Sequence, residues 1–207
     1  MPKSLVINCS LKMDGKIPEL LDAFEKFSEC RVVSFRGISP DFEIGKNIDA
    51  IVLSGSAARI VKLVDRDMFK ETANLIKQTD LPLFSICYGH QLLCWSLGAS
   101  VESHPAEIER FEAIKILDFD ELFAGFEKNQ TVPLAQHHHD YVTKESLQEA
   151  NLVLLASSES CEVEAIKHQR KPFYGVQFHP ERIKINNETH HEGLSIIENF
   201  YKNVVKR

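Results

Sequence analysis

Cys87 stands where an apolar run ends and a helical pattern begins, a position that suits a nucleophile. The segment before it, 81–87, is predicted to be a strand, and the segment after it, 89–98, a helix. A sharp strand-to-helix turn holds its central side chain out into a cleft and needs small neighbours, which Ser85 and Gly89 supply. The free N–H groups and partial positive charge of a helix N-terminus also stabilise a thiolate. Cys87 is therefore a candidate nucleophile, and a buried structural cysteine is the alternative.

A thiolate nucleophile requires a histidine that carries protons and a carboxylate that orients the histidine. The sequence YGVQFHPER places His179 at the end of a predicted strand and Glu181 two residues further on. Pro180 lies between them and restricts the backbone that joins the two side chains. Acyl transfer also needs donors for an oxyanion, and the glycine loop VLSGSAA, at 52–58, offers a backbone N–H. These residues predict a Cys-His-Glu triad beside an oxyanion site.

The elements that must position these residues follow an alternating pattern in the first half of the chain. Apolar runs predict strands at 4–8, 31–35, 49–55 and 81–87, and helical patterns appear at 17–27, 65–78 and 89–98. The second half is rich in predicted strands, at 111–117, 131–139, 151–158, 162–168 and 173–179, before a final helix at 191–205. We therefore expect an α/β fold with an open, mostly parallel or mixed sheet and helices on both faces. Ligands bind outside the carboxyl ends of the strands in such sheets.

Size and charge restrict the class of protein. The 207 residues carry a net charge of −6 and are 43% hydrophobic, so we expect one globular domain over 1–207. The absence of a basic stripe argues against nucleic-acid binding. No apolar run approaches the ~20 residues that span a bilayer, and no signal-peptide pattern is present, so we expect a cytoplasmic protein. Five cysteines without a CxxC pair favour neither a disulfide framework nor a zinc cage.

Three motifs, SICYGHQ, GVQFHPE and VLSGS, together resemble the class I glutamine amidotransferases, which carry G-x-C-x-G-x-Q, a late H-P-E and an early glycine loop. The resemblance covers nearly the whole chain, with the motifs in the expected order. It implies a flavodoxin-like α/β fold and hydrolysis of L-glutamine through a γ-glutamyl thioester on Cys87. His179 and Glu181 complete the triad under this resemblance, and ammonia passes to a synthetase partner.

The same resemblance implies roles for residues around the triad. Gly55 and Tyr88 lend oxyanion N–H groups beside Ser56, and Gln91 helps to hold the glutamine. The chain departs from the family at two places. Ser85 stands where a glycine is usual, and 55–57 reads Gly-Ser-Ala where the family has Gly-Gly-Pro.

The segment HHHDYV, 137–142, is similar to the H-x-D-x-V segment of the glutaminase part of GMP synthetase, with matches at His138, Asp140 and Val142. This similarity implies a separate ATP-using synthetase subunit for a partner, and GMP synthesis from XMP. It makes His138 a candidate for contacting the substrate or the partner, and Asp140 a candidate for contacting the partner. The chain has no glycine-rich phosphate loop, so ATP and magnesium belong to the partner, and we expect no cofactor on this chain.

Two alternatives remain open. One is a stand-alone γ-glutamyl hydrolase, and the other is a catalytically weakened module kept for binding or regulation, which the serine at position 56 favours. The three histidines at 137–139 also invite a metal assignment. On a strand, however, His138 points away from its two neighbours, and no fourth ligand stands at zinc-like spacing, so no metal site is predicted.

Overall fold

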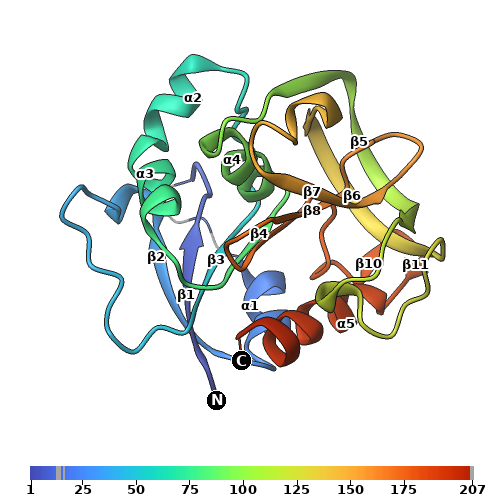
Figure 1. Ribbon diagram of the computed structural model, residues 1–207, viewed down its shortest axis with the longest axis horizontal. Coiled ribbons are helices and arrows are strands. Elements are labelled where there is room, and N and C mark those ends of the chain that lie inside the picture. Colours follow the sequence, from blue (N-terminus) through green and yellow to red (C-terminus); the bar gives the residue numbers. More distant parts are fainter. Residues whose placement is uncertain (13–14, 16, 206–207) are drawn as a thin grey trace.

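The computed structural model describes residues 1–12, 15 and 17–205, and a nine-stranded sheet forms its centre (Figure 1). Five strands run parallel in the spatial order β2-β1-β3-β4-β9. They are β1 (Lys3–Asn8), β2 (Glu29–Ser34), β3 (Ala50–Leu53), β4 (Leu83–Ile86) and β9 (Phe173–Val176). Every residue of β3, β4 and β9 is buried. Such burial is expected of central parallel strands that helices cover on both faces, and it explains their apolar sequences.

The sheet continues with four strands in antiparallel pairing, in the order β8-β7-β5-β6. They are β8 (Ala165–His168), β7 (Leu152–Ser157), β5 (Val101–Ile116) and β6 (Thr131–Val142). β5 and β6 form a long ribbon whose register shifts between Ser103 and Ile108. β5 begins well before the predicted strand at 111–117. The prediction missed the first part of β5 because that part is mostly exposed and carries little apolar signal. A small hairpin, β10 (Lys184–Ile185) with β11 (Glu188–Thr189), lies outside the main sheet.

Helices cover both faces of the sheet, as predicted. They are α1 (Pro18–Phe24), α2 (Leu63–Met68), α3 (Lys70–Gln78), α4 (Tyr88–Ser96) and α5 (Glu192–Asn199), which continues as a π-helix (Phe200–Val205). Short 3-10 turns lie at Phe35–Gly37, Glu121–Phe123 and Lys144–Ser146. One apolar cluster contains α1 and α5, and a second contains α3 and α4, so the two clusters lie on opposite faces. No helix in the described ranges is long and apolar enough to cross a bilayer.

The predicted helix at 65–78 is wrong in one respect, because the structure divides it into α2 and α3 at Phe69. Phe69 is completely buried and stacks on Phe35, with 3.9 Å between the ring centroids. Its ring also lies 4.7 Å from the Tyr88 ring, measured between centroids. The burial of this large ring fixes the position of the break, and α2 is left outside the core.

The carboxyl ends of β3, β4 and β9 meet at one edge of the sheet. Leu53 pairs with Ser85, and Ser85 pairs with Gly175, so the three strands end side by side. The Cys87 backbone N–H donates to the Val176 carbonyl at 2.8 Å, which extends this pairing past the end of β4. The segments that leave this edge carry Gly55, Ser56, Cys87, His179 and Glu181, whereas the predicted His138 and Asp140 lie on β6.

Candidate active site

Cys87 occupies the turn between β4 and α4 with φ of 52° and ψ of −110°. A non-glycine residue adopts this backbone region only where its surroundings hold it, and such strain is frequent at active sites. A Cβ on Gly89 would lie 2.7 Å from the Leu53 carbonyl oxygen, so the turn needs a glycine there. Ser85 is fully buried and donates to the Tyr174 carbonyl at 3.0 Å, which explains how a serine fits on the other side.

His179 and Glu181 form a hydrogen-bonded pair, as the predicted triad requires. His179 Nδ1 lies 2.7 Å from Glu181 Oε1, and both side chains are largely buried. A Cβ placed on Gly55 would lie 3.7 Å from His179 Nε2 and 3.6 Å from Cys87 Cβ. The His179 imidazole and the Cys87 side chain therefore lie on either side of the position that a Cβ of residue 55 would occupy. Because residue 55 is a glycine, that position stays open. The backbone N–H of His179 donates to the Ala135 carbonyl at 2.7 Å and fixes the histidine against β6.

The protonation of His179 depends on its two neighbours. Burial disfavours a charged imidazole, but the Glu181 carboxylate and the Cys87 sulfur outweigh burial and raise the pKa of His179 well above its usual value. The raised pKa favours the imidazolium form of His179, whose Nε2 is buried without a hydrogen-bond partner among the described residues. An imidazolium beside a sulfur nucleophile is the proton donor that a departing amine needs.

The candidate oxyanion donors lie on two sides of Cys87. Gly55 follows β3, and Tyr88 is the first residue of α4, where backbone N–H groups have no acceptor within the helix. Ser56 Oγ accepts a hydrogen bond from the Ala58 N–H at 3.0 Å. Ser56 is not among the described non-glycine residues with positive φ, so its backbone conformation is one that a serine adopts without strain.

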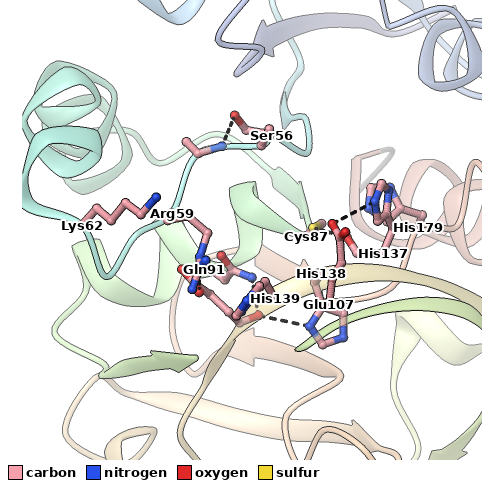
Figure 2. A pocket seen from close by; sticks show the side chains of 13 residues that line it. Ser56, Arg59, Lys62, Cys87, Gln91, Glu107, His137, His138, His139 and His179 are labelled. Carbon is pink, nitrogen blue, oxygen red and sulfur yellow. Dashed lines mark hydrogen bonds and ion pairs between the residues drawn. The ribbon is translucent and has the colours of Figure 1, made fainter. Parts of the chain in front are cut away.

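A cavity of about 380 Å³ opens beside Cys87 and His179 (Figure 2). One wall is the loop after β3, another is the end of β6, and α4 contributes Gln91. The full lining is Ser56, Ala57, Ala58, Arg59, Lys62, Cys87, Gln91, Glu107, His137, His138, His139, Asp140 and His179. The cavity is thus rich in polar groups and brings together most of the predicted site residues.

Gln91 and His138 are held by the same carbonyl group. Gln91 Nε2 donates to the Asp140 carbonyl at 2.7 Å, and His138 Nδ1 lies 3.2 Å from it. Burial, with a smaller effect from His104, lowers the pKa of His138 to about 4, so this imidazole is neutral at pH 7. Because a carbonyl only accepts, Nδ1 carries the proton and Nε2 is left as an acceptor. Nε2 is buried without a hydrogen-bond partner among the described residues.

Asp140 does not occupy the position that its predicted role requires. Its side chain is only 1% exposed, and Oδ1 accepts from Arg59 Nε at 2.6 Å and from Ser103 Oγ at 2.9 Å. The prediction that the Asp140 carboxylate contacts a docked partner protein is therefore wrong for this conformation. His138 is also buried, so of its two predicted roles a contact with the substrate stays a prediction and a contact with the partner is disfavoured. Arg59, with 24% of its side chain exposed, and the exposed Ser103 are the members of this cluster that reach the surface.

Sequence reasoning did not find Arg59 or Glu107. Arg59 follows the glycine of the glycine loop by four residues, and that position was the one signal that could have found it. Glu107 lies on the exposed early part of β5 and pairs with His137, with 3.1 Å between Oε1 and Nε2. The His137 carbonyl oxygen also accepts a hydrogen bond from the Cys87 thiol at 3.3 Å. Within 1–12, 15 and 17–205, no three possible metal ligands gather in a metal-binding arrangement.

Known families and curated relatives match most of this chain. A family model described as glutamine amidotransferase class-I matches residues 17–204. A glutamine-hydrolyzing GMP synthase subunit of Methanothermobacter thermautotrophicus is 39% identical over 128 residues, 61% of this chain and 62% of that protein. The corresponding subunit of Methanococcus aeolicus is 33% identical over 162 residues, 78% of this chain and 77% of that protein. The first of these alignments thus covers less than two thirds of the relative.

Solved structures share the fold. A Thermoplasma acidophilum protein described as a GMP synthase subunit gives a TM-score of 0.79 at 23% identity, over 97% of this chain and 92% of that chain. A glutamine amidotransferase from Thermotoga maritima gives 0.69 at 19% identity, over 87% of this chain and 77% of that chain. The mixed sheet and its helices therefore match solved amidotransferase structures. With the family model spanning most of the sequence, the chain belongs to the class I glutamine amidotransferases.

Proposed function

We propose that this chain hydrolyses L-glutamine at Cys87 and delivers the ammonia to a separate ATP-using synthetase subunit that converts XMP to GMP. The observation that carries the proposal is the assembled set of Cys87, His179 and Glu181 around the open point at Gly55. The glutamine-hydrolyzing GMP synthase relatives support the choice of acceptor. Each of these relatives is described as one subunit of its synthase, which supports a second subunit that carries the remaining activity.

The first half of the reaction makes a thioester. Cys87 Sγ attacks the carboxamide carbon of glutamine, and the developing oxyanion lies toward the N–H groups of Gly55 and Tyr88. His179 gives its proton to the departing nitrogen, the C–N bond breaks, and ammonia leaves. Glu181 stabilises the imidazolium before this proton transfer and orients the neutral imidazole after it, because its carboxylate lies on Nδ1.

The second half releases glutamate. Water attacks the thioester carbon, His179 takes a proton from the water, and the C–S bond breaks to regenerate the sulfur nucleophile. The amino-acid head of the substrate lies along the polar wall formed by Gln91 and His138. The unpartnered Nε2 of His138 gives that wall an acceptor for a substrate N–H.

The test measures ammonia and glutamate release by the purified chain, alone and with the ATP-pyrophosphatase subunit of GMP synthase from the same host. XMP, ATP and magnesium are present in both arms. We expect a slow reaction alone and faster turnover with the partner, with GMP formed from glutamine. Cys87→Ala should retain ammonia-dependent GMP formation by the partner and lose the glutamine-dependent reaction.

Two results contradict the proposal. A high rate alone that the partner leaves unchanged identifies a stand-alone γ-glutamyl hydrolase. Absence of turnover in both arms identifies a binding or regulatory module that has lost the chemistry.

A further inference from the structure

Helix α2 exposes apolar side chains that the rest of the fold does not cover. Leu63 and Val64 are 71% and 72% exposed, and Met68 is 41% exposed. The other large hydrophobic residues exposed in the described ranges are Met1, Val32 and Phe119. Half of these residues therefore lie on one helix, and α2 contributes no buried residue to the core. Grouped exposed apolar residues mark interaction sites more often than scattered ones do.

Polar contacts hold α2 in place. The Arg59 backbone N–H donates to Asp65 Oδ2 at 2.6 Å, and Arg66 Nε donates to the Ile60 carbonyl at 2.6 Å. The Arg66 guanidinium also lies over the Trp95 ring, 5.7 Å from its centroid. A helix in a globular protein normally turns its apolar side inward. Here the inward contacts are polar and the apolar side faces solvent, so the orientation is fixed with the apolar surface presented.

The α2 surface is continuous with the mouth of the active-site cavity. Most of the segment 56–62 lines the cavity, and this segment runs directly into α2, with Lys62 just before the helix (Figure 2). Arg59, in the middle of this segment, is tied to the buried Asp140 on the opposite wall. A protein that covers α2 therefore also lies next to the cavity mouth and contacts the segment that follows Gly55.

We infer that Leu63, Val64 and Met68 form the docking surface for the synthetase subunit. This inference rests on the proposed function, because ammonia released at Cys87 reaches an acceptor undiluted only if the acceptor's protein closes the cavity mouth. Exposed Lys62 and Lys70 flank the apolar residues, and exposed Asp67 lies among them on α2. Lys70 pairs with Glu71, with 4.0 Å between Nζ and Oε1. The partner face that fits has an apolar centre, with an acidic group opposite Lys62 and a basic group opposite Asp67.

The test compares two variants with the wild-type chain. The docking variant carries Leu63→Gln, Val64→Gln and Met68→Gln, which remove apolar surface and keep good helix formers. Phe119→Gln is the matched control, because Phe119 is 74% exposed and precedes the Glu121–Phe123 turn, which packs against α5. Binding to the ATP-pyrophosphatase subunit is measured by calorimetry, and GMP formation is measured with glutamine and separately with ammonium.

We expect the docking variant to bind the partner at least tenfold more weakly and to need correspondingly more partner for glutamine-dependent GMP formation. Its basal glutaminase rate and circular dichroism should match the wild type, and Phe119→Gln should bind normally. Wild-type affinity in the docking variant overturns the inference. A wild-type dimer that this variant converts to monomers also overturns it, since a second copy then covers α2. Failure of the proposed function is distinct, because there the wild type itself yields no glutamine-dependent GMP.

Discussion

The parallel and antiparallel halves of the sheet contribute to the site in different ways. The parallel half supplies the proposed reacting groups, because Cys87 and His179 follow β4 and β9 and Gly55 follows β3. Backbone contacts fix them, such as the hydrogen bond from the Cys87 N–H to Val176. The antiparallel half supplies the end of β6, whose residues line the cavity and are held by hydrogen bonds to one another. We therefore expect changes in the parallel half to alter turnover, and changes in β6 to alter substrate affinity.

The largest expected effect is that of Cys87→Ala in the parallel half. Loss of the nucleophile should lower kcat at least about a thousandfold, as removal of a triad nucleophile does in other enzymes. The fold should remain, because one sulfur atom is removed at the edge of the cavity. Ammonia release and the thermal unfolding midpoint measure the two effects.

A glutamine analogue with an electrophile at the γ-position should label Cys87 and none of the other four cysteines. Burial raises the pKa of the Cys9 thiol to about 12 and that of Cys30 to about 11, and it raises the pKa of Cys94 and Cys161 as well. These thiols stay protonated and react slowly. Peptide mapping by mass spectrometry checks this result, and labelling of Cys94 with Cys87 untouched would contradict the assignment.

A smaller loss of turnover should follow from Glu181→Gln than from His179→Asn, because the carboxylate orients and stabilises the imidazolium without carrying the proton. Removing the carboxylate leaves burial as the main influence on His179, so its pKa should fall below that of the wild-type chain. The pH dependence of kcat measures this shift. Equal losses in the two variants would give Glu181 a structural role instead.

The role of β6 is tested by Asp140→Asn, which keeps the shape of the side chain and removes the charge that pairs with Arg59. We expect KM for glutamine to rise about tenfold with a smaller change in kcat, because the cavity wall loses its fixed geometry while the triad stays in place. Steady-state kinetics separate the two parameters. A fall in kcat with unchanged KM would contradict the expectation that β6 controls substrate affinity and the parallel half controls turnover.

The smallest effect on activity is expected from Glu164→Gln, inside the antiparallel half. Burial raises the pKa of Glu164 to about 7, despite hydrogen bonds from Gln136 and Ser158. Its folded pKa lies above the unfolded value, so its contribution to stability is present at pH 4 and is lost as the pH rises to about 7. The wild type should therefore lose roughly 2–3 kcal/mol relative to Glu164→Gln between pH 4 and pH 8. Urea unfolding at both pH values measures the difference, and parallel pH curves would contradict it.

The places of the proposed reacting groups in the fold could be predicted from sequence because they follow from local rules. An apolar run that ends in Cys87 before a glycine gives both the strand and the turn, and His179 and Glu181 lie two residues apart. The wall of β6 could not be predicted as fully. The ion pair between Asp140 and Arg59 joins residues 81 positions apart, and no local sequence pattern predicts such a contact.

Two features of the fold escaped prediction for related reasons. The early part of β5 is exposed and held by pairing with β6, so hydrophobic periodicity does not reveal it. The break at Phe69 arises because tertiary stacking on Phe35 overrides a continuous helical pattern. Elements that bury a regular apolar stripe can therefore be predicted from the sequence. Elements that are fixed by contacts with distant residues cannot.

The insertion of β9 between β4 and β8 has a consequence for how the protein acquires activity during folding. Ser85 on β4 donates a hydrogen bond to the carbonyl of Tyr174 on β9, although the two residues lie 89 positions apart in the chain. Closing so long a loop is slow compared with forming the local helices. His179 follows β9 and cannot meet Cys87 until that strand is seated. In refolding from denaturant, helical circular dichroism should thus recover before ammonia release, and the newly made chain should not carry an activated thiol until its last long segment is in place.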